Sequence, residues 1–184
     1  AYCSQQGRVI SILRMSEDAD GLLAHLPASM VDTTLTKLRK YLLRAKVSMA
    51  PAPGGAPETN DSRLRDIAAG QPQVYPETSE AFVAQMLNLD LLDGISFNKG
   101  CYTGQEIIAR AHYRGQVKRR MQRFRTAGAR ELRPGDEGEL SDGRAFKVVQ
   151  AAQLPDGTCE FLAVAPLGGA VPEGLALPYA LPVG

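Results

Sequence analysis

Residues 94–110, which read GISFNKGCYTGQEIIAR, are the part of this sequence that says most about its fold. Ile107, Ile108 and Ala111 recur on one face at helical spacing, so this stretch predicts a helix from residue 104 to about residue 113. The segment therefore predicts a turn that enters a helix, with its polar and sulfur-containing residues gathered at the junction.

A capping box is predicted at the start of this helix. Thr103 and Glu106 have the T-x-x-E spacing, in which the hydroxyl accepts from one backbone amide and the carboxylate from the other. Tyr102 and Ile107 have the spacing of a hydrophobic staple. Glu106 could alternatively pair with Arg110, four residues along the helix.

Cys101 lies just ahead of the predicted helix and has two interpretations. The positive end of the helix and the cation of Lys99 would stabilise a thiolate, which favours a reactive or ligand-facing thiol. A cysteine at such a turn could equally pack as a small hydrophobe. Gly100 and Gly104 keep side-chain bulk away from the thiol, and both interpretations stay open.

Short elements upstream of this segment predict an α+β arrangement. They are a strand at 8–13, a strand at 22–26, a helix at 31–42 with a capping box at Ser29 and Asp32, a strand at 47–50, a helix at 62–69, and a helix at 80–92 whose Leu-rich end could equally be a buried turn. The segment 51–57, PAPGGAP, is typical of a linker or surface loop.

The pattern changes beyond residue 115. Strand-length segments at 119–125, 145–152 and 159–165 are separated by Gly and Pro turn signals, which favours a small β-barrel or sandwich. We therefore expect two domains, an α+β part at 1–115 and a β-barrel at 116–184.

The near-neutral net charge of +1 over 184 residues hides a basic segment. Nine basic residues and one acid lie between residues 110 and 133. Such a strip could bind RNA phosphates, or it could be a solvated face of the barrel.

The cysteine and histidine content argues against a disulfide framework or a metal site built by this chain. The three cysteines are far apart and odd in number, and the two histidines have no metal-ligand spacing. No run approaches the length of a membrane span, so we expect a protein of the reducing cytoplasm that does not contact membrane.

The segment 94–110, followed by HYRGQVKRR at 112–120, closely resembles the signature of the folate-binding YgfZ family. The family is related to the aminomethyltransferase T-protein of the glycine cleavage system. QGRVISILR at 6–14 also resembles the early strand of that family.

The resemblance implies a tetrahydrofolate-binding protein that supports the assembly or repair of iron–sulfur clusters in client enzymes, including enzymes that modify tRNA. It implies a T-protein-like folate-binding fold with a ferredoxin-like element and a small C-terminal β-barrel. The reactive group would be Cys101. The remaining family positions carried over as cofactor-binding are Lys99, Gly100, Tyr102, Thr103, Gly104, Gln105, Glu106, Arg110 and Arg114.

The chain also departs from the family pattern. Family members are longer, so either this is a compact variant, or residues ahead of Ala1 and an internal segment near 51–60 are missing here. No acid precedes Glu17 where the T-protein has its catalytic aspartate, and Ala68 stands where a pterin-binding glutamate is expected. We therefore expect an accessory factor in place of an aminomethyltransferase.

Two other functions are considered. An RNA-binding module could contact tRNA through Arg114, Lys118, Arg119, Arg120, Arg123 and Arg125, although the segment offers only Tyr113 and Phe124 for base stacking. A thiol enzyme would need His25 or His112 as the base for Cys101.

Isolated residues elsewhere in the chain are expected to be structural. Cys3, His25 and Cys159 are predicted core residues. Tyr41 and Tyr75 are predicted packing groups that could alternatively line a pterin site.

Overall fold

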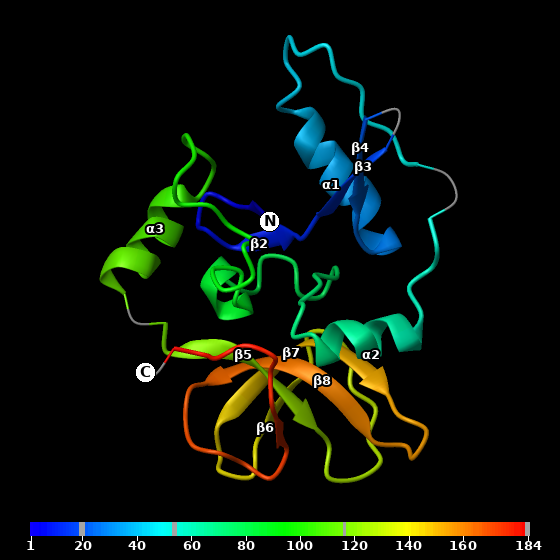
Figure 1. Cartoon of the computed structure of the whole chain (residues 1–184), viewed down its shortest axis with the longest axis vertical. Coiled ribbons are helices and arrows are strands. Elements are labelled where there is room, and N and C mark those ends of the chain that lie inside the picture. The colour runs from blue at the N-terminus through cyan, green and yellow to red at the C-terminus, as the bar shows by residue number, and fades with distance from the viewer. Residues whose placement is uncertain (19–20, 53–54, 116, 183–184) are drawn as a thin grey trace.

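The computed structural model describes residues 1–18, 21–52, 55–115 and 117–182 (Figure 1). It is a mixed α/β structure with a multi-stranded sheet and few helices. Its elements are β1 (Tyr2–Cys3), β2 (Val9–Ser11), β3 (Arg14–Asp18), β4 (Gly21–His25), α1 (Ala28–Arg39), α2 (Asn60–Ala68), the 3-10 helix η1 (Ala84–Leu87), α3 (Gln105–Arg114), β5 (Arg119–Arg125), β6 (Glu137–Glu139), β7 (Ala145–Gln153), β8 (Cys159–Pro166) and β9 (Gly174–Leu175).

The C-terminal part is an antiparallel sheet with the strand order β6-β7-β8-β5-β9. The three strands predicted here are confirmed as β5, β7 and β8. The sheet covers a cluster that includes Phe124, Phe146 and Phe161, whose rings pack in tilted pairs. Within the described residues no ladder joins β6 to β9, so the closed β-barrel stays a prediction.

The N-terminal part holds two small antiparallel sheets, β1-β2 and β3-β4. The strands predicted at 8–13 and 22–26 are confirmed in shorter or shifted form as β2 and β4. The strand predicted at 47–50 is wrong, because that stretch has no regular structure and Val47 is 58% exposed. The T-protein-like fold and its ferredoxin-like element stay predictions.

Two of the three upstream helices are confirmed, with corrections at their ends. The capping box predicted at Ser29 and Asp32 is wrong, since α1 begins after Pro27 and has no side-chain cap. Helix α2 is instead capped by a reciprocal pair of hydrogen bonds between Thr59 and Ser62. The helix predicted at 80–92 shrinks to η1, which ends at the left-handed Asn88 (φ 57°), so the alternative of a buried turn is confirmed.

One hydrophobic cluster joins residues from both sides of position 115. Val9, Ile67 and Leu87 from the N-terminal part pack in the same cluster as Met121 and Leu162 from the sheet. Helix α2 lies against β7 and β8, on the side of the sheet that faces the N-terminal part (Figure 1). The division at residue 115 stays a prediction, and the core itself crosses that boundary.

No helix in the described ranges is both long enough and apolar enough to cross a membrane.

Candidate functional site

The residues at the start of α3 form the predicted turn into a helix, one position later than the spacing implied. Gly104 is the N-cap in the left-handed region (φ 81°), and the helix runs from Gln105 to Arg114. The predicted capping box is wrong, because no side chain caps this helix. Instead, Gln105 folds back and its Oε1 accepts a hydrogen bond of 3.1 Å from the amide of Tyr102.

Gly104 faces the chain at residues 4–7. A Cβ built on Gly104 would lie 3.0 Å from the Cα of Gly7 and would overlap the carbonyl oxygen of Ser4. Gly7 is also left-handed (φ 68°), and its own Cβ would lie 3.1 Å from the Cβ of Ile107. The early turn and the helix start therefore approach through two glycines, as close backbone contact requires.

The early turn is held in place by hydrogen bonds to the backbone of the segment 80–83. The guanidinium of Arg8 donates to the carbonyl oxygens of Glu80 and Ala81, at 3.3 and 2.9 Å. The amide of Val9 donates to the carbonyl of Phe82 at 2.8 Å. These bonds place β2 beside the segment that leads into η1.

Thr103 faces the end of the first helix rather than capping its own. Side-chain hydrogen bonds connect Tyr41 to Thr103 and to Tyr2, and together they lower the pKa of Tyr41. Burial and the bond to Tyr41 raise the pKa of Tyr2 to about 12. Tyr41 itself is 59% exposed, so it lies at the surface beside the loop 98–104.

The loop 98–104 places a cation over an aromatic ring. The Nζ of Lys99 lies 4.5 Å from the centroid of the Tyr102 ring, and Tyr102 packs partly into the main core cluster. Cys101, between them, is exposed and free. Of its two interpretations, packing as a buried hydrophobe is therefore wrong.

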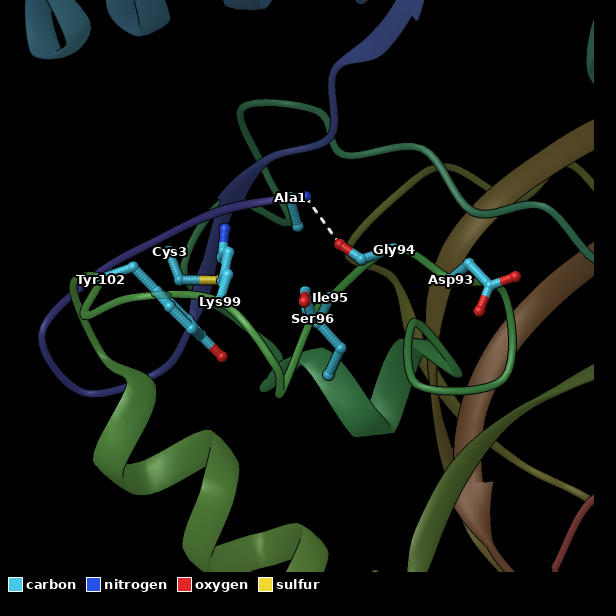
Figure 2. Close-up of a pocket in the computed structure, with 8 residues that line it drawn as sticks. All are labelled: Ala1, Cys3, Asp93, Gly94, Ile95, Ser96, Lys99 and Tyr102. Carbon is cyan, nitrogen blue, oxygen red and sulfur yellow. Dashed lines mark hydrogen bonds between the residues drawn. The ribbon is translucent and has the colours of Figure 1, made fainter.

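A pocket of about 190 Å³ lies on one side of this loop (Figure 2). Lys99 and Tyr102 line one end of it, and Asp93 lies at the far end of the group drawn in Figure 2. Ile95 and Ser96 lie between them. The pocket thus offers a cation and an aromatic ring, while the carboxylate of Asp93 points away from the other lining residues in Figure 2.

The other predicted site residues are dispersed along α3. Glu106 and Arg110 are exposed, and in the described part of the chain they form no ion pair with each other. Arg114 is the last residue of the helix, about three turns from the pocket-lining loop. Only Lys99 and Tyr102 of the predicted set line the pocket.

Much of the predicted basic strip is neutralised by the protein itself. Arg120 is 5% exposed and forms a two-pronged ion pair with Asp90, at 2.9 and 2.8 Å. Arg123 pairs with Glu160 at 2.7 Å, and Arg125 pairs with Asp156. The predicted tRNA contact through Arg120 is therefore corrected, because a buried and paired guanidinium cannot reach an RNA phosphate.

An aromatic group that the sequence did not indicate lies at the far end of α3. His112 stacks on Phe97 with ring centroids 4.0 Å apart, and Tyr113 lies edge-on to His112 at 4.8 Å. Phe124, the second stacking residue expected from the sequence, is instead 1% exposed in the sheet core. The separation of Phe97 from His112 in the sequence explains why periodicity could not find this group.

The structure confirms some of the remaining single-residue predictions and contradicts others. Cys3 and Cys159 are core residues as predicted, whereas His25 is exposed and its ring bonds Ser16 at 2.9 Å. Tyr75 is buried, and its hydroxyl donates to Glu58 at 2.6 Å, so it is a packing group. Among the residues that the structure describes, no three His, Cys, Asp or Glu side chains gather as a metal site.

Comparison with known proteins found relatives but no matching family model. The tRNA-modifying protein YgfZ of Yersinia pseudotuberculosis serotype O:1b (strain IP 31758) is 28% identical over 229 aligned positions, covering 86% of this chain and 69% of the relative. The proteins of the same name from Serratia proteamaculans (strain 568) and Pectobacterium atrosepticum are 43% and 44% identical over 108 and 105 residues. Those two matches span 55% and 53% of this chain and about a third of each relative (33% and 32%).

The Yersinia alignment is longer than the chain itself. Its 229 positions exceed the 184 residues present here, so parts of the relative lie opposite gaps in this chain.

Proposed function

This chain belongs to the YgfZ-like family, and from that membership we propose that it is an accessory protein of tRNA modification that binds a reduced folate. In this proposal the protein supports the assembly or repair of iron–sulfur clusters in client enzymes, some of which modify tRNA. The observation that carries the folate part is the pocket lined by Lys99, Tyr102 and Asp93.

The pocket lining matches the chemistry of one end of a folate. A folate has a flat heterocycle with N–H donors and a tail with carboxylates. The cation of Lys99, which lies over the ring of Tyr102, complements the carboxylates.

The size of the pocket limits how much of the ligand it could hold. Sites for drug-sized ligands measure about 300–1,000 Å³. The pocket here measures about 190 Å³. We therefore propose that it takes one end of the folate, and that the remainder extends over the exposed loop 98–104, beside the thiol of Cys101.

A thermal-shift titration of the full-length protein with tetrahydrofolate tests the folate part. Ligand at about 100 times Kd stabilises a protein by about 2.7 kcal/mol, so the melting temperature should rise by several degrees. Lys99→Met should reduce the shift strongly, while Lys46→Met, which removes an exposed lysine outside the pocket, should not. Absence of any shift in the wild-type protein would refute folate binding.

The proposed role in tRNA modification is tested by a measurement in cells. Cells that lack the gene should show reduced levels of specific modified tRNA nucleosides by mass spectrometry, and the wild-type gene should restore them. If the Lys99→Met gene restored the modified nucleosides as completely as the wild-type gene, the tRNA role would not depend on the pocket. Unchanged nucleosides in the deletion strain would refute the tRNA role itself.

A further inference from the structure

The aromatic group at the end of α3 is exposed and yet ordered by its own contacts. Tyr113 is 69% exposed and His112 is exposed as well. Phe97, beneath them, packs partly against the main core cluster. The three rings therefore form a surface cluster with one anchored member and two members open to solvent.

The geometry of these rings is that of a preformed stacking surface. Phe97 and His112 lie 4.0 Å apart with planes inclined by 21°, which is a stacked pair. The ring plane of Tyr113 is inclined by 84° to that of His112 and by 69° to that of Phe97, so its face points in a different direction from theirs. Rings held this way lose little conformational freedom when a planar ligand stacks on them.

The surrounding sequence is strongly basic. Between residues 97 and 119 there are five cations and one acid, Glu106; the cations are Lys99, Arg110, Arg114, Lys118 and Arg119. Arg110, Lys118 and Arg119 are exposed, and in the described ranges none of them forms an ion pair. These cations contrast with Arg120, Arg123 and Arg125, whose charges the protein neutralises.

We propose that Phe97, His112 and Tyr113 form a stacking platform for an unpaired base of single-stranded RNA, with the exposed cations nearby holding the adjoining phosphates. Nonspecific recognition of single strands combines these two features, stacked aromatic rings and a positively charged path for the backbone. The inference rests on the proposed role in tRNA modification, since it names the part of a tRNA that this surface would contact.

RNA is favoured over the other ligands that could cover exposed rings. A protein partner would be expected to meet an apolar patch, whereas the stretch of sequence that carries the rings, residues 97–119, holds five cations and one acid. A free pterin needs several hydrogen-bond partners along its edge, whereas the ring cluster itself offers only the Tyr113 hydroxyl and the His112 ring nitrogens. A polyanion with planar bases matches both the charge and the rings.

The test uses a single-stranded RNA of about eight nucleotides that carries one 2-aminopurine, a fluorescent base quenched by stacking. The full-length protein should quench its fluorescence and bind it more tightly than a duplex of the same sequence. Tyr113→Ala should weaken binding about ten-fold and reduce quenching, since stacking on one residue contributes about this much. Tyr113→Phe should bind as the wild type does.

Two further variants separate stacking from other contributions. Tyr113→Leu keeps apolar area but has no aromatic face, so it should behave like Tyr113→Ala. Leu43→Ala removes an apolar side chain that is 90% exposed outside the cluster, and it should leave binding unchanged. Lys118→Gln should weaken binding at low salt and reduce its salt dependence.

Each contrary result has a definite meaning. The platform would be overturned if Tyr113→Ala bound the single-stranded RNA as tightly as the wild type. It would also be overturned if the wild-type protein bound the duplex equally well, or if tetrahydrofolate fully displaced the RNA. If the platform fails while deletion of the gene still lowers tRNA modification, the proposed function stands without it. If RNA binding depends on Tyr113 but the deletion leaves tRNA unchanged, the platform stands and the proposed function fails.

Discussion

Gly104, at the start of α3, lies directly against Gly7 in the turn between β1 and β2. A Cβ on Gly104 would come within 3.0 Å of the Gly7 Cα and would overlap the carbonyl oxygen of Ser4. This contact joins the two segments, 6–14 and 94–110, in which the sequence resembles a known family. The loop that carries Lys99 and Cys101 is therefore positioned by a backbone contact that tolerates no side chain.

Gly104→Ala should destabilise the protein by about 1–3 kcal/mol, because it adds a Cβ at a positive φ and against backbone. Urea unfolding at constant m-value measures this. Gly100→Ala is the matched control, since a Cβ there meets nothing within 4 Å. Equal stability of the two variants would contradict the close packing of Gly104 on Gly7.

Arg120→Met should lower the free energy of unfolding by about 3–5 kcal/mol, because it leaves the carboxylate of Asp90 buried without its partner. The side chains of the pair are 5% and 8% exposed. Arg133→Met breaks a pair whose side chains are 75% and 70% exposed and should change stability by less than about 0.5 kcal/mol. Chemical denaturation of both variants checks the difference, and a small effect at Arg120 would mean that the pair is solvated.

Tyr75 should make stability fall at alkaline pH. Burial, and then the hydrogen bond to Glu58, raise the pKa of Tyr75 in the folded state. Below about pH 10 the Tyr75 hydroxyl keeps its proton in both the folded and the unfolded chain. Above this pH the unfolded chain releases the proton first, so the free energy of unfolding falls as the pH rises.

Tyr75→Phe should flatten this alkaline slope relative to the wild type and lower stability at neutral pH by about 1–3 kcal/mol through loss of the hydroxyl bond. Unfolding curves between pH 8 and pH 11 measure both effects. An unchanged slope in Tyr75→Phe would show that other groups cause the alkaline loss.

Cys101 should be the first thiol to react in the native protein. It is exposed, whereas Cys3 and Cys159 are buried and their pKa values are raised by burial. N-ethylmaleimide should label Cys101 at least about ten-fold faster than the other two, and Cys101→Ser should remove the fast phase. Peptide mapping by mass spectrometry identifies the site, and fast labelling of Cys3 would contradict its burial.

Local pattern predicted the elements whose signals lie within one stretch of chain. The apolar spacing around Ile108 and the strand-length runs at 119–125 and 159–165 sufficed, because periodicity and turn residues are properties of neighbours. The capping box at Thr103 failed for a tertiary reason. Gly104 takes the N-cap position instead, where it packs against Gly7.

By itself, then, the sequence determined the loop and helix around Cys101, the strands of the sheet and the likeness to the YgfZ family. Only the tertiary structure decided which charges and rings are available to a ligand. Arg120 and Tyr113 are both part of the segment that looked like one basic strip, yet one is buried against Asp90 and the other is 69% exposed. The physical reason is that burial and ion pairing depend on partners distant in sequence, which no local pattern contains.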